Sequence, residues 1–159
     1  YGTVLNRFVM QAAIGHPLTV HGSGGQTRAF IHIKDTVQCI SLAIKNPPSK
    51  KEKVKIFNQT TEQHNVKALA EKISSMSKAK IKYFSNPRNE DSSNNLKVSS
   101  KSFIKLGLNP TKLNDGLMNE IHKIATKYKN RCNKSKIIAT SLWKKNKIID
   151  TNGSDTPIK

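Results

Sequence analysis

The sequence predicts an α/β protein, because short β-branched segments alternate along it with segments whose apolar residues recur at helical spacing. The chain has 159 residues, of which 35% are hydrophobic, and this is enough for one domain with a buried core. No run of about 18 apolar residues occurs in the sequence, so no membrane-spanning helix is expected.

The first part of the chain is expected to form a helix and two strands. Apolar residues at helical spacing predict a helix over 4–14 (VLNRFVMQAAI), and the Gly15 and Pro17 that follow are typical of a helix end. A short strand is expected at 18–20, and alternation predicts another at 29–33, with a glycine-rich turn between them.

A second helix is expected to start at Asp35 or Thr36, either of which can cap it, and to run through Ile44. The two prolines of Asn46-Pro47-Pro48 would end it. The side of this helix that is predicted to pack is formed by Val37, Ile40, Ser41 and Ile44. The segment 54–58 (VKIFN) is then predicted to be a strand.

The rest of the chain is expected to hold three more helices and one strand. Asn65 is predicted to cap the first of these helices, and the strand is expected at 81–84. Ser99 or Ser100 would cap a short helix, and the last helix is predicted over 113–128. The apolar stripes of the first and last of these helices are Val66, Leu69, Ala70 and Ile73, and Leu113, Leu117, Ile121, Ile124 and Ala125.

The helical signal weakens near residue 130. We therefore expect two regions, one over 1–129 and a C-terminal extension over 130–159 that is partly disordered. The chain opens with YGTVLNRF, without an initiator Met or a signal-like apolar segment, and this predicts a fragment of a longer protein.

The net charge of +18 is carried mainly by the chain after residue 46. The first 46 residues hold four basic residues and one acidic residue, which leaves 24 basic and nine acidic residues for the rest. Such an excess is typical of proteins that bind nucleic acid or other anionic ligands. It consists mostly of lysines mixed with Asn and Ser, which also fits compositional drift on a solvated surface. No helix-turn-helix, aromatic stacking motif or zinc pattern favours nucleic-acid binding.

Motifs of self-contained catalysis and of metal binding are absent from the sequence. The glycine cluster 22–25 leads into a second strand, and not into the helix that holds a pyrophosphate in dinucleotide-binding loops. Cys39 and Cys132 lack CxxC spacing, and Cys39 is expected to be a small core residue. The five histidines have no metal-binding spacing and are interpreted as ordinary surface or strand residues: His16, His21, His32, His64 and His122.

Two arginines are candidates for the recognition of an anion. Arg28 stands between the glycine turn and an apolar strand, so the strand would fix its backbone and aim its guanidinium toward the turn. Arg88 follows Pro87, whose φ is fixed by its ring, and precedes the acids Glu90 and Asp91. The alternative for each arginine is an ordinary surface salt bridge.

The segment RAFIHIKD, residues 28–35, resembles the R-x-(F/Y)-I-H-(V/I)-x-D signature of the extended short-chain dehydrogenases/reductases that act as nucleotide-sugar epimerases and dehydratases. It follows a strand and glycine loop, LTVHGSGGQT, in the order usual for that family, and Phe57-Asn58 matches a later family position. The resemblance implies the C-terminal part of an NAD(P)-binding Rossmann-like protein. It would be mainly the substrate-binding lobe, with the last Rossmann strand also within 1–129.

The resemblance also implies which residues bind a UDP-sugar. Arg28 would reach the diphosphate, with Gln26 beside it in the sequence and Arg88 as a second donor. Glu90 or Asp91 would accept hydrogen bonds from the ribose hydroxyls of the uridine. Further contacts are implied for Thr3, Val4, Leu5 and Asn6 with the sugar nucleotide, and for Thr19, Val20 and His21 with the uracil, largely through backbone groups. The family's catalytic tyrosine and lysine have no match here and are expected in another half of the protein.

Within the family, the stretches FNQTTEQ and NPR resemble a member that uses UDP-glucose and sulfite as substrates, with NAD held mainly by the other half. The complete enzyme would oxidise the sugar at C4, add sulfite at C6 and return the hydride, whereas this chain alone is expected to be inactive. The resemblance implies a homodimer in a plastid stroma or a cyanobacterium-like cytoplasm, without nucleic-acid or membrane partners. The sequence leaves open another NAD-dependent UDP-sugar epimerase or dehydratase, a basic nucleic-acid-binding module, and an inert product.

Overall fold

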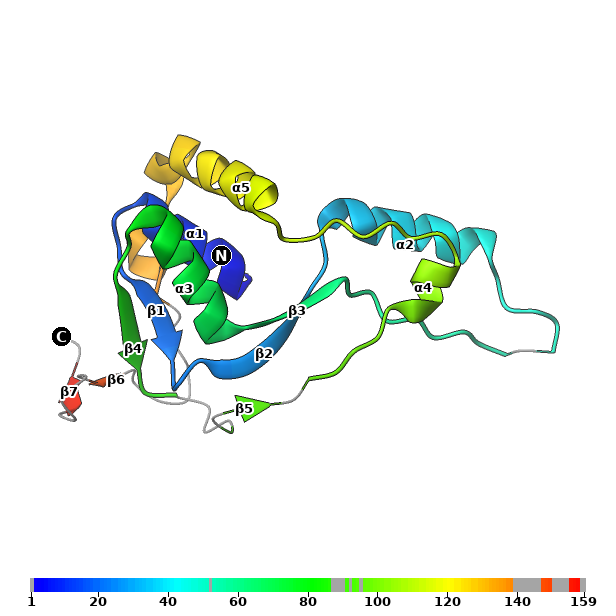
Figure 1. Cartoon of the computed structure of the whole chain (residues 1–159), viewed down its shortest axis with the longest axis horizontal. Coiled ribbons are helices and arrows are strands. Elements are labelled where there is room, and N and C mark those ends of the chain that lie inside the picture. Colours follow the sequence, from blue (N-terminus) through cyan, green and yellow to red (C-terminus); the bar gives the residue numbers. More distant parts are fainter. Residues whose placement is uncertain are drawn as a thin grey trace. The chain divides into compact units, whose positions relative to one another are not determined.

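A computed structural model describes residues 2–51, 53–86, 91, 93–94, 96–138, 147–149 and 155–157 of the chain (Figure 1). The chain divides into two compact units. The first unit comprises residues 1–27, 65–95 and 115–159, and the second comprises residues 28–64 and 96–114. Strands and helices alternate along the chain, which confirms the predicted α/β class.

The first unit contains a sheet with the strand order β1-β4-β6-β7. Strand β1 (Leu18–His21) runs parallel to β4 (Ile81–Phe84), with Leu18 opposite Ile81 and His21 opposite Phe84 (Figure 1). Strand β6 (Lys147–Ile149) pairs antiparallel with β4 and with β7 (Asp155–Pro157). The two strands predicted at 18–20 and 81–84 are therefore confirmed, and they lie side by side.

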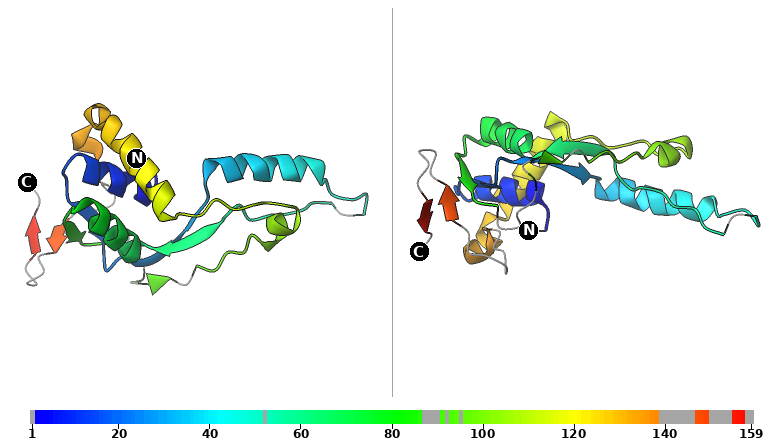
Figure 2. Two further views of the ribbon diagram at one scale, coloured as in Figure 1. Left: turned by 45° about the horizontal axis from the view of Figure 1, so that its top comes forward. Right: turned by 90° about the horizontal axis from the view of Figure 1, so that it is seen from below.

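Among the described residues of the first unit, three segments are α-helices. Helix α1 (Val4–Ala13) packs against α3 (Val66–Ser77), α5 (Asp115–Lys127) and β1, and α3 also packs against β1 and β4 (Figure 2). Packing of this kind removes apolar surface from water and is the main contribution to stability. The buried apolar side chains of the unit are Leu5, Phe8, Val9, Leu18, Val20, Val66, Leu69, Ala70, Ile73, Phe84, Met118, Ala125 and Ile137.

Local capping explains where two of these helices begin. The hydroxyl of Thr3 accepts a hydrogen bond from the backbone N–H of Asn6 at 3.3 Å, at the start of α1. The amide oxygen of Asn65 accepts from the backbone N–H groups of Lys67 and Ala68, at 3.0 and 3.3 Å. The prediction that Asn65 caps a helix is confirmed. All four residues of its predicted stripe are buried.

Two short 3₁₀ helices, Lys129–Arg131 and Lys134–Lys136, follow α5. The next residue, Ile137, is fully buried, so the first part of the predicted extension packs on the first unit. The boundary near residue 130 and the partial disorder of 130–159 stay predictions.

A second sheet has the strand order β3-β2-β5. Strand β2 (Gly25–Phe30) begins in the first unit, where it runs parallel to β5 (Ser93–Asn94), with Gly25 opposite Ser93. Strand β3 (Glu62–Asn65) is its other neighbour, and neither β3 nor β5 was predicted. Sequences this short and polar carry no strand pattern, and the neighbouring strand decides their conformation.

The second unit also contains α2 (Ile33–Lys45) and the short α4 (Lys101–Lys105). Its buried cluster consists of Cys39, Phe103 and Leu108, and the Phe57 ring lies 4.9 Å from the Phe103 ring. Burial, and to a smaller extent the charge of Asp35, raises the pKa of the Cys39 thiol. The prediction that Cys39 is a core residue is confirmed.

The start of α2 differs from the prediction. Strand β2 ends at Phe30, so the predicted strand over 29–33 is displaced toward the glycine turn. His32, and not Asp35 or Thr36, is the N-cap, because its Nδ1 accepts from the backbone N–H of Lys34 at 3.2 Å. Asp35 lies in the first turn instead.

The predicted packing side of α2 is wrong. Val37, Ile40 and Ile44 are 60%, 50% and 74% exposed, and Ser41 is exposed as well. Cys39, Leu42 and Ala43 form the packed side instead. A periodic pattern shows that a helix has an apolar stripe, but it does not show which other element covers that stripe.

The segment 54–58 is also not a strand, because it pairs with no strand among the described residues. Its side chains Val54 and Ile56 are 69% and 84% exposed. A β-branched segment adopts the strand conformation only when a neighbour accepts and donates its backbone hydrogen bonds.

The ends of the last helices differ slightly from the sequence pattern. Ser100 is the N-cap of α4 by position, but it forms no side-chain capping bond, and Ser99 Oγ accepts from Lys101 N at 3.3 Å instead. Helix α5 begins at Asp115, two residues after the predicted start, and Ile124 is 51% exposed, whereas Met118 is fully buried. None of the helices in the described part of the chain is long and apolar enough to cross a membrane.

Candidate functional site

A tight glycine turn joins β1 to β2 in the first unit. Gly24 has φ +73°, and a Cβ there would lie 2.8 Å from a methyl carbon of Val20, so both the backbone and the packing require glycine. The turn is held by the start of α3. Lys67 N donates to Gly24 O at 2.9 Å, and the Asn65 side chain donates to Gly25 O at 2.8 Å. Asn65 therefore caps α3 and anchors the turn with the same amide.

Strand β1 is the edge strand of its sheet as far as the described residues show. Leu18 N donates to Lys80 O and Gly22 N to Phe84 O, both at 2.8 Å, so the even-numbered residues direct their backbone groups toward β4. Alternate residues of a strand face opposite sides. The backbone groups of Thr19 and His21 therefore point away from β4, at the edge where the resemblance implies the uracil.

The first turn of α1 holds four of the residues expected to bind a ligand. Thr3 and Asn6 are exposed, Val4 is half-buried, and the side chain of Leu5 is buried. Leu5 can thus offer a ligand little more than its backbone. Helix α1 packs against β1, so these residues and Thr19 belong to neighbouring elements of the same unit.

Gln26 is buried beside the glycine turn. A side chain at Gly22 would meet Asn86 Cβ at 3.4 Å and Gln26 Nε2 at 3.6 Å, so the Gln26 amide and Asn86 lie against the outside of the turn. The His21 ring lies 5.9 Å from the Phe84 ring, and its Nδ1 is 3.4 Å from Ser85 O. The predicted residues Thr19, Val20, His21 and Gln26 are therefore gathered around one strand end and its turn.

The remaining predicted residues lie elsewhere in the chain. Arg28 is half-buried on β2, in the part of that strand that belongs to the second unit. Asp91 is exposed. Arg88 and Glu90 lie outside the described residues, so their predicted roles stay predictions.

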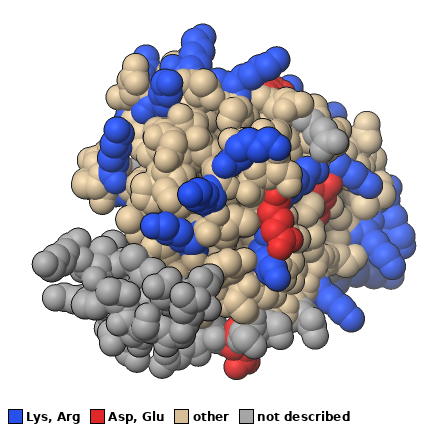
Figure 3. All heavy atoms as spheres, turned by 60° about the vertical axis from the view of Figure 1, so that its left-hand side comes forward, with Lys and Arg blue, Asp and Glu red and all other residues tan. Residues whose placement is uncertain are grey.

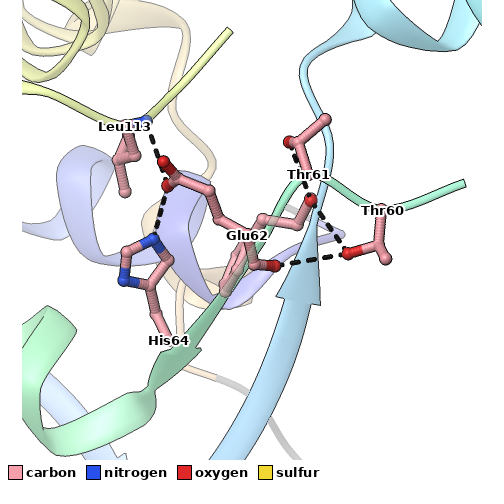
Figure 4. Close-up of polar contacts among 6 residues, drawn as sticks. Thr60, Thr61, Glu62, His64 and Leu113 are labelled. Atoms are coloured by element: carbon pink, nitrogen blue, oxygen red, sulfur yellow. Dashed lines mark hydrogen bonds and ion pairs between the residues drawn. The ribbon is translucent and has the colours of Figure 1, made fainter. Parts of the chain in front are cut away.

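The second unit contains a polar cluster that no local pattern of the sequence predicts. The Glu62 carboxylate accepts from His64 Nε2 at 2.7 Å and from Leu113 N at 3.0 Å (Figure 4). The hydroxyls of Thr60 and Thr61 and the N–H of Thr61 donate to Phe30 O, at 3.3, 3.2 and 2.8 Å. These bonds attach the segment before α5 to β3, and attach β3 to the end of β2.

A second carboxylate anchors the same segment. Asp35 is buried and accepts from the backbone N–H and the hydroxyl of Thr111, both at 2.8 Å. Asp35 is the last residue of the RAFIHIKD motif, so this position of the signature has a structural partner in the chain itself. Glu62 and Asp35 therefore both accept hydrogen bonds from the segment that precedes α5.

The described residues do not fit a metal ion or a bound dinucleotide. Within the described part of the chain no three His, Cys, Asp or Glu side chains are grouped to hold a metal. The glycine turn leads into strand β2, and not into a helix whose N-terminal N–H groups would hold a pyrophosphate. The prediction that NAD is held mainly by another part of the protein stays a prediction.

Basic side chains are spread widely over the surface. Figure 3 shows one face, on which Lys and Arg are distributed over the molecule with few Asp and Glu among them. This agrees with the net charge of +18. The positive electrostatic potential of such a surface attracts anions in general and does not select one ligand.

Comparison with known proteins identifies relatives of this chain. Residues 1–58 match the NAD dependent epimerase/dehydratase family. The chain is 41% identical over 150 residues to the chloroplastic UDP-sulfoquinovose synthase of Spinacia oleracea, and 34% identical over 152 residues to the UDP-sulfoquinovose synthase of Sulfolobus acidocaldarius. Each match covers 91% of this chain, but only 31% and 38% of these relatives. The chain therefore spans about a third of their length.

Two solved structures have a similar fold. The UDP-glucuronic acid 4-epimerase of Bacillus cereus, in complex with UDP-glucuronic acid and NAD, matches with a TM-score of 0.57 and 21% identity over 82% of this chain and 40% of that one. The UDP-N-acetylglucosamine 4-epimerase of Bacillus cereus matches with a TM-score of 0.54 and 22% identity over 90% of this chain and 43% of that one. The described α/β arrangement thus corresponds to part of the fold of UDP-sugar epimerases.

Proposed function

We propose that this chain, a homologue of UDP-sulfoquinovose synthases, is the substrate-binding portion of an NAD-dependent enzyme that makes UDP-sulfoquinovose from UDP-glucose and sulfite. The observation that carries the proposal is the identity to two such enzymes along nine-tenths of the chain. The motif RAFIHIKD and the gathering of Thr19, Val20, His21 and Gln26 around one strand end support it.

In this proposal the edge of β1 receives the uracil. Thr19 N donates to the buried Gln11 Oε1 at 3.1 Å, so in this proposal the uracil contacts the Thr19 carbonyl and the backbone of His21, which point away from β4. The exposed side chains of Thr3 and Asn6, with Val4 and the backbone of Leu5, contact the sugar nucleotide from α1. The residues therefore bind and orient the substrate.

The diphosphate would be held by arginine. Arg28 carries a planar guanidinium on a strand, and such a fork forms two charge-assisted hydrogen bonds with phosphate oxygens. Arg88 would be the second donor, Gln26 an additional polar contact, and Glu90 or Asp91 would accept from the ribose hydroxyls. Two cationic forks would neutralise the charge of the diphosphate.

Hydride chemistry is supplied by NAD when it is bound elsewhere in the complete protein. The residues of this chain bind and orient the substrate, and no residue described here is placed to move the hydride. We propose a homodimer as the complete form. A plastid stroma or a cyanobacterial cytoplasm is the proposed location, in keeping with the chloroplastic relative from spinach.

The test is turnover by the complete protein. The purified full-length protein is expected to form a sulfonated UDP-sugar from UDP-glucose only when sulfite is present. The 159-residue chain alone is expected to form none. Turnover of UDP-glucose without sulfite would indicate another UDP-sugar epimerase. Binding to arbitrary DNA that falls steeply with salt, without saturable binding of UDP, would favour a nucleic-acid-binding module instead.

A further inference from the structure

The guanidinium of Arg7 in α1 forms no ion pair in the described part of the chain. Its Nε is buried and has no hydrogen-bond partner there. Its backbone N–H donates to Thr3 O at 3.0 Å, and the guanidinium carbon lies 5.7 Å from the centre of the Phe8 ring. The residue as a whole is only half-buried, so part of the side chain still faces solvent.

An unpaired guanidinium in this position is unfavourable. Burial lowers the pKa of Arg7 from its ordinary value, since the charged form loses its hydration. Folded proteins normally give a buried charge an opposite charge or several hydrogen bonds. Glu71 Oε1 lies 3.9 Å from Lys67 Nζ, and Glu62 Oε2 contacts His64 Nε2. None of the described carboxylates forms an ion pair with Arg7. The Phe8 ring attracts the cation but cannot accept the in-plane N–H groups.

The end of the helix where Arg7 lies is also positive. Helix α1 has ten residues, and its first turn contains no acidic residue, so the positive end of its dipole is not offset by a carboxylate. Arg7 is four residues from the cap Thr3, which places it about 6 Å farther along the helix axis. The same turn, Thr3 to Asn6, is the one proposed above to contact the sugar.

We propose that Arg7 binds an oxyanion, and that in the reaction proposed above this anion is sulfite. The inference rests on the proposed function for the identity of the anion, but its geometric basis is independent of it. A guanidinium offers two parallel N–H groups that match two oxygens of such an anion. The diphosphate is already assigned to Arg28 and Arg88, and sulfite is the other anion of the reaction.

Kinetics of the full-length protein test the assignment. Arg7→Gln keeps a polar side chain and removes the charge, and it is expected to raise the KM for sulfite at least tenfold. The KM for UDP-glucose should change less than twofold. Arg7→Lys keeps the charge but loses the fork, so it should lie between Arg7→Gln and the unchanged protein. Arg131→Gln is the matched control, because Arg131 is exposed and its guanidinium carbon lies over the Tyr128 ring, 4.7 Å from the ring centre.

A binding measurement separates this inference from the proposed function. Sulfate, an unreactive oxyanion, should raise the melting temperature of the full-length protein more than chloride does at equal ionic strength, and Arg7→Gln should abolish the difference. An unchanged sulfite KM in Arg7→Gln overturns the inference. So does a loss of stability in that variant together with no effect of sulfate, since a protein carboxylate would then neutralise Arg7. A protein that shows the sulfate effect but no turnover of UDP-glucose would contradict only the proposed function.

Discussion

Gln11 holds Thr19 with both ends of its side-chain amide. Its Nε2 donates to Thr19 Oγ1 at 2.8 Å, and its Oε1 accepts from Thr19 N at 3.1 Å. The same Nε2 lies 3.4 Å from Ile137 O, so one buried side chain connects α1, β1 and the segment after the second 3₁₀ helix. The amide lies where a further strand would pair with Thr19. It therefore covers this part of the edge of β1.

Removal of this amide should destabilise the first unit. Gln11→Leu fills a similar volume but leaves the buried N–H and hydroxyl of Thr19 without a partner. The expected loss is about 1–3 kcal/mol of unfolding free energy. Urea unfolding followed by circular dichroism measures it. Gln38→Leu is the control, because Gln38 makes one exposed hydrogen bond, to Gly107 O at 3.3 Å. An equal loss of unfolding free energy in the control would mean that the buried Gln11 hydrogen bonds are not its cause.

Glu62 should be equally important for the second unit. Glu62→Ala removes the acceptor of both His64 and the backbone N–H of Leu113, and the half-buried cluster should lose about 1–3 kcal/mol. The matched change Glu71→Ala removes an exposed ion pair with Lys67 at 3.9 Å, and should cost about 0.5 kcal/mol or less. Hydrogen exchange at the Leu113 amide gives a second, local readout. Continued protection of that amide in Glu62→Ala would contradict the proposed anchor.

If the proposed function is right, Arg28 should act on UDP-glucose through its geometry as well as its charge. Arg28→Lys keeps the charge and loses the two-pronged donor, so kcat/KM for UDP-glucose should fall by an amount equivalent to about 1–3 kcal/mol. Arg28→Ala should cost more, because a phosphate oxygen then loses its donor in a partly dehydrated site. Steady-state kinetics at one salt concentration measure both effects.

The controls for Arg28 are two lysines of α5. Lys123 and Lys127 are exposed, so Lys123→Ala and Lys127→Ala should leave kcat/KM nearly unchanged. If they reduce it as much as Arg28→Lys does, diffuse positive charge is the operative feature, and the proposed role of Arg28 is wrong.

Lys78 offers a stabilising change. It ends α3 in the left-handed conformation, with φ +60°, and its side chain is exposed. An L-residue with a side chain is strained there, whereas glycine is not, so Lys78→Gly should raise stability by about 1 kcal/mol. The opposite sign is expected for Lys123→Gly in the middle of α5, which should cost about 1 kcal/mol. Thermal melts of both variants decide whether the backbone conformation is the cause.

The helices α1 and α3 and the strands β1 and β4 were predictable because their signals are local. The cap at Asn65 and the stripe through Leu69 and Ile73 lie within two turns of one another, and the same residues perform the same roles in the structure. The signature around Arg28 was likewise visible, because a motif is a contiguous stretch of sequence. Neither kind of signal depends on what lies beyond the segment.

Tertiary structure decided the features that depend on a distant partner. The stripe of Val37, Ile40 and Ile44 is real, but the cluster around Cys39 packs on another side of α2, so periodicity alone chose the wrong side. Segment 54–58 has strand composition but no partner strand among the described residues. Without the hydrogen bonds of a neighbouring strand, its strand conformation is not stabilised.

The sequence by itself determined which segments can be helices and which residues can carry a charge to a ligand. It could not determine that Glu62 accepts from Leu113, 51 positions later, or that Gln11 reaches Ile137, 126 positions later. Nor could it show that the Nε of Arg7 is buried without a hydrogen-bond partner among the described residues. The physical reason is that burial and hydrogen bonding are properties of the folded surroundings, which bring together residues that have no relation along the chain.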